Sequence, residues 1–148
     1  MDAPLIDEQI AKQVRDIFQK LRQPVQILFF GQAEGCEYCL ETRQLLEEVA
    51  ALSPLLSIRI FDLQVDTDVA AHYHVDKAPG YVIAAGAGDD ANDYGIRFYG
   101  VPFGNEFASL INSLVLVSLR DSGLSQATRD ALKKLDQRVI LQTFTTPT

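Results

Sequence analysis

The two cysteines of the chain, Cys36 and Cys39, are the residues whose type and spacing point most directly to chemistry. Two cysteines placed at random in a chain of this length would lie three residues apart roughly once in a hundred cases. A thiolate attacks a disulfide sulfur, and a neighbouring thiol then attacks the mixed disulfide that results. The spacing therefore predicts dithiol–disulfide exchange, with a nucleophilic cysteine at 36 and a resolving cysteine at 39.

The elements around the two cysteines support this prediction. The apolar run 25–31, VQILFFG, is rich in branched and aromatic residues and predicts a short buried strand. A loop over 31–35 follows, and a helix is expected from about Cys36 to Leu52. Free backbone N–H groups and the helix dipole at the start of that helix would stabilise a thiolate at Cys36.

The other segments complete an α/β pattern. A helix capped by Asp7 precedes the first strand, and the order along the chain is α-βαβα-ββα. This order predicts a central mixed β-sheet with helices on both faces. Beyond the elements already given, we expect strands at 55–63, 81–85 and 94–100 and helices at 6–21, 66–75 and 105–119.

The composition excludes several classes of protein. Of the 148 residues, 47% are apolar and 22% are charged, which is enough to bury a core and argues against disorder. The net charge of −7 argues against a nucleic-acid module, because phosphate binding needs a basic face. The apolar runs are too short to span a membrane, and the amphipathic, acidic start is unlike a signal peptide. We therefore expect a cytoplasmic protein.

The end of the chain repeats its beginning. Residues 121–144 match residues 7–30 at eight of 24 positions, whereas unrelated segments would match at about one or two. We therefore expect one unit over 1–120, followed over 121–148 by a linker helix and the first strand of a second unit, near 139–144. The chain would then be a piece of a two-unit protein.

A strand, a Cys-x-x-Cys at the start of a helix, and an Ala78-Pro79 step that opens a later strand together resemble the thioredoxin/glutaredoxin superfamily. The segments CEYC (36–39), YHVDKAPG (73–80) and IRFYGVPFGNEF (96–107), followed by a linker helix and the ending TFTTPT (143–148), resemble more closely the N-terminal unit of the protein disulfide oxidoreductases, which carry two thioredoxin-like units in tandem. The resemblance covers nearly the whole chain. It implies a thioredoxin-like fold for 1–120, extended by an extra N-terminal helix.

The resemblance also implies roles for individual residues. Cys36 would be the nucleophile and Cys39 the resolving cysteine. Pro79 would be cis, with its loop facing the disulfide, and the backbone of Ala78 would pair with a bound substrate strand. Tyr38 would either pack over the site, beside the substrate, or cover the helix surface.

The motif departs from the thioredoxin pattern in three respects. Gly35 stands where thioredoxins carry a tryptophan, and the middle of the motif is Glu37 and Tyr38. Phe30 corresponds to the buried aspartate of the preceding thioredoxin strand, so this proton acceptor is missing. Negative charge opposes a thiolate, and three glutamates crowd the motif: Glu34, Glu37 and Glu41.

The predicted function is that of a protein disulfide oxidoreductase, which exchanges dithiol for disulfide with protein substrates. A thioredoxin-reductase-like protein is a candidate electron donor. We expect no organic cofactor and no metal, because the sulfurs carry the two electrons themselves. A dimer formed by strand addition through residues 139–144 is a further hypothesis.

Several alternatives stay open. The cysteines could be an inert buried pair, half of a zinc site completed by His72 and His74, or ligands of an iron–sulfur cluster shared across a dimer. The chain could relay electrons between a flavoprotein reductase and a peroxiredoxin, an architecture resembling that of bacterial alkyl hydroperoxide reductases. It could also be a non-catalytic binding unit whose Pro79 loop holds extended chains.

Overall fold

A four-stranded mixed sheet forms the centre of the chain in the computed structural model, which describes residues 3–146. Its strands are β1 (Val25–Gly31), β2 (Leu56–Asp62), β3 (Gly80–Ala85) and β4 (Asn92–Tyr99), in the spatial order β2-β1-β3-β4. β1 runs parallel to β2 and antiparallel to β3, and β3 pairs antiparallel with β4. The mixed sheet predicted from the sequence is confirmed.

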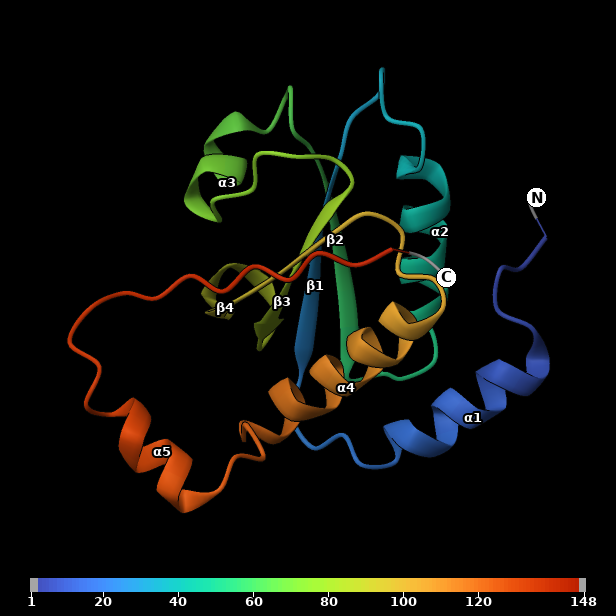
Figure 1. Cartoon of the computed structure of the whole chain (residues 1–148). Helices are drawn as coiled ribbons and strands as arrows, with labels where there is room; N and C mark the ends of the chain where they lie inside the picture. The colour runs from blue at the N-terminus through green and yellow to red at the C-terminus, as the bar shows by residue number, and fades with distance from the viewer. Residues whose placement is uncertain (1–2, 147–148) are drawn as a thin grey trace.

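Helices cover both faces of this sheet. Figure 1 shows α3 on one side and α2 and α4 on the other, with α1 below them. No helix within residues 3–146 is long and apolar enough to cross a membrane. The helices are α1 (Glu8–Phe18), α2 (Cys39–Ala50), α3 (Thr67–His72), α4 (Asn105–Leu119) and α5 (Gln126–Leu132), with a short 3-10 turn η1 (Gly88–Asp90) before β4.

The helix boundaries follow local signals in the sequence. α4 begins and ends where the apolar spacing predicts. α2 begins at Cys39, three residues later than predicted, because Tyr38 takes the N-cap position after a turn. Asp66 precedes α3 as expected, but its side chain does not cap the helix. Its carboxylate instead accepts the backbone N–H of Asp62 at 2.7 Å.

β1 is buried along its whole length and divides the core into two clusters. Its side chains alternate between faces, because successive residues of a strand point to opposite sides. On one face Phe29 packs with α1, α2 and α4, in a cluster that includes Cys39. On the other face Phe30 packs with Tyr73 and the residues around α3. The cysteine motif therefore belongs to the face covered by α2 and α4.

The start of the chain is held by one carboxylate of α2. Glu48 accepts the backbone N–H of Leu5 at 3.0 Å and that of Ile6 at 2.9 Å, and the amide of Gln44 at 2.8 Å. Burial opposes the charged form of Glu48, but these three donors outweigh it and hold its pKa below the ordinary value of 4.5. Glu48 thus anchors the segment that leads into α1.

This anchor predicts a pH-dependent stability. Since the pKa of Glu48 is lower in the folded state than in the unfolded state, its contribution is present above pH 4.5 and is lost as the pH falls through the folded-state pKa. Urea unfolding of the parent and of Glu48→Gln should therefore differ at about pH 7 and converge towards about pH 3. A difference that stays constant over this range would contradict the prediction.

A second prediction concerns Ser118, which is fully buried at the end of α4. Its hydroxyl accepts the N–H groups of Arg22 (2.9 Å) and Gln23 (3.1 Å) and donates to the carbonyl of Gln23 (2.8 Å). Ser118→Ala leaves these groups unpaired and should cost about 1–3 kcal/mol of unfolding free energy. The matched control is Ser113→Ala on the same helix, since the half-buried Ser113 makes one hydrogen bond, to the carbonyl of Ser109. Equal losses in the two variants would argue against the prediction.

The strand predicted at 139–144 is not formed. After α5 the backbone runs without strand pairing to residue 146, and the side chains of Val139, Ile140, Leu141 and Phe144 are exposed. The repeat relates these residues to β1, a central strand with partners on both sides. An apolar segment becomes a strand only where an edge accepts its hydrogen bonds, and among the described residues this segment pairs with neither edge of the sheet.

α5 itself is present as expected, with Ser125 as its N-cap. Within residues 3–146, one hydrogen bond joins the segment after α5 to the sheet unit, from Thr145 to Glu106 at the start of α4. Residues 147–148 of the predicted second unit lie outside the described range. The division of the chain at 120 and 121 therefore stays a prediction.

Candidate active site

The two cysteines form a disulfide at the point where β1 gives way to α2. Cys36 lies in the loop after the strand and Cys39 is the first residue of the helix, with 5.5 Å between their Cα atoms. Cys39 is 7% exposed and belongs to the apolar cluster, whereas Cys36 is half-buried and lies at its edge. Of the two sulfur-bearing residues, Cys36 is therefore the more accessible to another molecule.

The pairing of β1 with β3 brings the proline loop to this point. Phe30 pairs with Gly80, so Ala78 and Pro79 lie beside the residues that lead from β1 into the motif. The Ala78–Pro79 peptide is cis, as predicted. Ala78 packs on the same apolar cluster as Cys36. No backbone–backbone hydrogen bond recorded for the described residues engages Ala78, which leaves its main chain available to a bound strand.

Two side chains hold in place the loop between β1 and α2 that contains Cys36. The sequence pattern does not single out either of them. Asp62, at the end of β2, accepts the N–H of Ala33 at 3.2 Å and that of Gln64 at 2.7 Å. The buried Thr42 donates to the carbonyl of Tyr38 at 2.6 Å, one turn earlier in the chain. The only sequence signal for this bond is that a threonine stands four residues after Tyr38, and this spacing alone is a weak signal.

Tyr38 lies at the surface of the molecule. Its side chain is 50% exposed, between the two cysteines in sequence. The neighbouring Glu37, through hydrogen bonding and its charge, raises the pKa of Tyr38, and the charge of Glu41 adds to this effect. The ring is therefore a solvent-facing apolar surface beside the disulfide, within the field of two carboxylates.

The side chains of β1 near the cysteines belong to opposite faces of the sheet. Phe30, which corresponds in sequence to the thioredoxin aspartate, lies in the cluster around α3, with 5.2 Å between its ring centroid and that of Phe61. A Cβ added at Gly31 would lie 2.8 Å from the ring of Phe29 and 3.5 Å from the Cys39 sulfur. Phe29 and Gly31 therefore occupy the face towards Cys39, and neither carries an acid.

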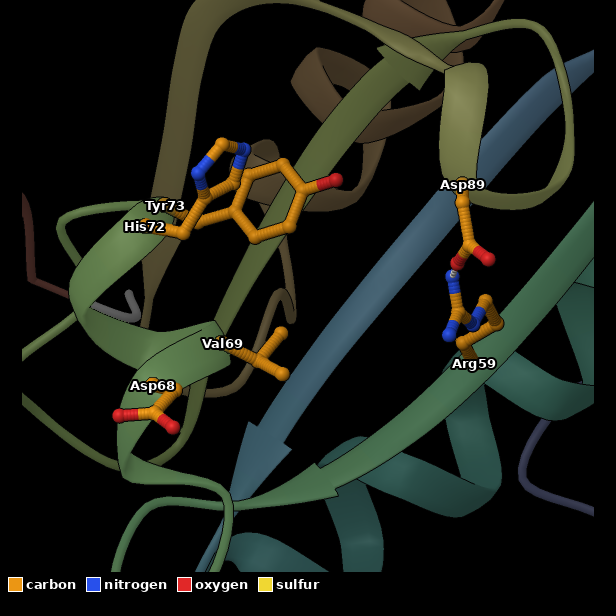
Figure 2. A pocket seen from close by; sticks show the side chains of 6 residues that line it. All are labelled: Arg59, Asp68, Val69, His72, Tyr73 and Asp89. Carbon is orange, nitrogen blue, oxygen red and sulfur yellow. Dashed lines mark hydrogen bonds and ion pairs between the residues drawn. The ribbon is translucent and has the colours of Figure 1, made fainter.

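A surface hollow of about 270 Å³ lies away from the disulfide. Figure 2 shows Val69 and His72 of α3 and the adjoining Tyr73 on one side of it, and the ion pair of Arg59 with Asp89 on the other. His72 is thus part of the α3 face, whereas both cysteines are engaged in their disulfide. Within residues 3–146 no group of three or more His, Cys, Asp or Glu side chains is arranged to hold a metal ion.

The arrangement defines a class of protein. A Cys-x-x-Cys disulfide between a buried strand and a helix, beside a cis-proline loop on a mixed sheet with helices on both faces, is the architecture of the thioredoxin-like redox proteins. The thioredoxin-like fold and the redox disulfide predicted from the sequence are both confirmed.

Two solved structures are particularly similar to this chain. A protein disulfide oxidoreductase from Aeropyrum pernix K1 superposes with a TM-score of 0.78 and 26% identity, over 93% of this chain and 57% of that one. The N-terminal domain of the alkylhydroperoxide reductase AhpF from Enterococcus faecalis superposes with a TM-score of 0.74 and 28% identity, over 84% of this chain and 58% of that one. No family model matches the chain.

Among curated proteins, the F subunit of the alkyl hydroperoxide reductase of Staphylococcus aureus is 25% identical over 134 residues. The match covers 87% of this chain but only 23% of the relative. The chain therefore spans about a quarter of the length of the curated relatives it matches.

Proposed function

We propose that this chain is a thiol–disulfide oxidoreductase that exchanges dithiol for disulfide with protein substrates through Cys36 and Cys39. The observation that carries the proposal is the disulfide itself, with Cys36 half-buried at the edge of the apolar cluster, Cys39 within the cluster and Ala78–Pro79 alongside. The similarity to a protein disulfide oxidoreductase over 93% of the chain supports it.

In the reducing direction, the Cys36 thiolate attacks one sulfur of a substrate disulfide. A bond forms between Cys36 and that sulfur, and the other substrate sulfur leaves as a thiolate. Cys39, as its thiolate, then attacks the Cys36 sulfur, which forms the Cys36–Cys39 disulfide and releases the second substrate thiolate. Two electrons pass from the protein to the substrate, whose thiolates take up protons from solvent. These steps require no organic cofactor, and the oxidising direction reverses them.

The surroundings of the disulfide give the substrate a place to bind. The backbone of Ala78 pairs with an extended substrate segment, as expected for a strand added beside a sheet. Pro79 fixes the loop that presents this backbone, and its own carbonyl is occupied by the N–H of Gly100 at 2.9 Å. Tyr38 contacts the substrate from the other side of Cys36.

A redox titration tests this proposal. The chain is equilibrated in dithiol buffers of graded potential, and the state of the two cysteines is read by alkylation and mass. We expect one reversible two-electron transition between about −270 and −120 mV, whose midpoint separates a reductant from an oxidant. Thiols that stay reduced throughout, or that resist alkylation until a metal is removed, would overturn the proposal.

A second candidate function is an electron relay between a flavoprotein reductase and a peroxiredoxin. It is favoured by the similarity to the N-terminal domain of the alkylhydroperoxide reductase AhpF. In that case the reduced chain should pass electrons to a peroxiredoxin disulfide much faster than to unrelated protein disulfides, and equal rates would argue against a relay.

Two further points remain predictions. A cytoplasmic location is expected from the sequence and is tested by fractionating cells that make the protein. A dimer through residues 139–144 is supported by their exposed apolar side chains. Light scattering that gives a mass of 16.4 kDa would exclude the dimer.

A further inference from the structure

The end of the sheet that carries the disulfide is strongly acidic. Glu34, Glu37 and Glu41 flank the two cysteines, and all three side chains are exposed. Asp62 adds a carboxylate at the same end, because the backbone N–H of Leu63 donates to the carbonyl of Gly31 at 2.8 Å. Figure 1 shows the motif loop and the connection between β2 and α3 together at this end of the molecule.

Nearby basic side chains do not neutralise the three glutamates. Arg43 pairs with Glu47 at 3.0 Å, one turn further along α2. In the proline loop, Lys77 pairs with its neighbour Asp76 at 2.8 Å. None of the ion pairs found among the described residues includes a glutamate of the motif. Their charge therefore faces solvent around the disulfide.

Exposed apolar surface lies among these carboxylates. Leu40, beside Cys39 in the first turn of α2, is 80% exposed, and Val65 in the connection after β2 is 78% exposed. Together with Tyr38 they offer contact area to a protein partner. Glu37 raises the pKa of Tyr38, first through hydrogen bonding and then through its charge, so a carboxylate lies beside the Tyr38 ring. A partner that buries these side chains must approach past the exposed carboxylates of Glu37 and Glu41.

We propose that this end of the molecule selects cationic disulfides: protein segments that carry Lys or Arg beside the disulfide to be exchanged. Opposite charge raises the local concentration of such a segment and orients it on Cys36, whereas an anionic disulfide is repelled. The peptide disulfide of glutathione, which carries net negative charge, is then a poor substrate. This inference rests on the exchange proposed above at Cys36 and Cys39.

Small disulfides of different charge test the selection. The full chain is reduced, freed of reductant and mixed with dicationic cystamine, neutral hydroxyethyl disulfide or dianionic dithiodipropionate. The readout is the ratio of the cystamine rate to the dithiodipropionate rate, in which the thiolate fraction of the protein cancels. At low salt, neutralising the glutamates should lower this ratio about tenfold. For the parent chain, raising the salt concentration to about 0.5 M should lower the same ratio by a similar factor.

The variant combines Glu34→Gln, Glu37→Gln and Glu41→Gln. A matched control changes net charge equally with Asp16→Asn, Asp90→Asn and Asp136→Asn, all exposed and placed in α1, in η1 and after α5. η1 lies at the opposite end of the sheet, since Gly88 pairs with Gln26 near the start of β1. We expect the control to keep the ratio of the parent.

The outcomes separate the two proposals. A tenfold fall confined to the motif variant supports the charge selection. An unchanged ratio, or an equal fall in the control variant, overturns it while leaving the exchange chemistry intact. If the neutral disulfide does not react with the reduced parent at all, the proposed function fails, whatever the charged probes do.

Discussion

Cys36→Ser should abolish disulfide exchange, lowering its rate by about 10³-fold or more. A serine hydroxyl is a far weaker nucleophile than a thiolate and forms no disulfide. Cys39, at 7% exposure within the apolar cluster, has little access to a substrate and should not replace it. The measurement is the initial rate at which the reduced chain cleaves a fluorescently labelled peptide disulfide. A variant that keeps the parental rate would contradict the assignment of the nucleophile.

Cys39→Ser is the matched variant and should fail differently. Its Cys36 thiolate still attacks the substrate, but no second thiol releases the product, so a mixed disulfide accumulates. Mass spectrometry should find the chain with one half of the substrate attached. In a purely binding unit, Cys36→Ser would leave peptide affinity unchanged and the parent would cleave nothing. The pair of variants therefore distinguishes an oxidoreductase from a binding module.

The chemistry of this site can be predicted from the sequence because its signals are local. The spacing of Cys36 and Cys39 is visible in four residues, and Pro79 stands directly before a buried strand. The apolar spacing of 105–119 likewise determines α4, because one face of that helix must be buried. Such features need no information about which distant segments meet.

Features that depend on distant segments cannot be predicted in this way. The face of β1 that meets Cys39 is set by strand register, and a shift of one residue exchanges the two faces. For this reason the sequence alone does not tell which of Phe29 and Phe30 shares a cluster with Cys39; in the structure it is Phe29. The strand predicted at 139–144 is not formed among the described residues for a related reason: its pattern is local, but its hydrogen-bond partners would have to come from elsewhere. The support that Asp62 gives to the motif loop is equally non-local.

Phe30→Ala should destabilise the chain by about 3–5 kcal/mol, the cost of removing a fully buried phenylalanine. Its ring lies 5.2 Å from that of Phe61 and 6.3 Å from that of Tyr73, so the truncation leaves a cavity between β1 and α3. Urea unfolding with the disulfide intact measures this loss. A loss below about 1 kcal/mol would mean that the aromatic cluster collapses around the cavity.

The placement of Phe29 and Phe30 on opposite faces of the sheet also predicts a difference in the rate of disulfide exchange. The milder variants Phe30→Leu and Phe29→Leu test this difference. Each should cost less than about 1.5 kcal/mol and leave the chain folded. Phe30→Leu should keep the parental rate of disulfide exchange, because its side chain lies across the sheet from the motif. Phe29→Leu should change that rate, since the ring of Phe29 lies against Gly31 in the cluster that holds Cys39. The opposite pattern would contradict this assignment of the two residues to opposite faces.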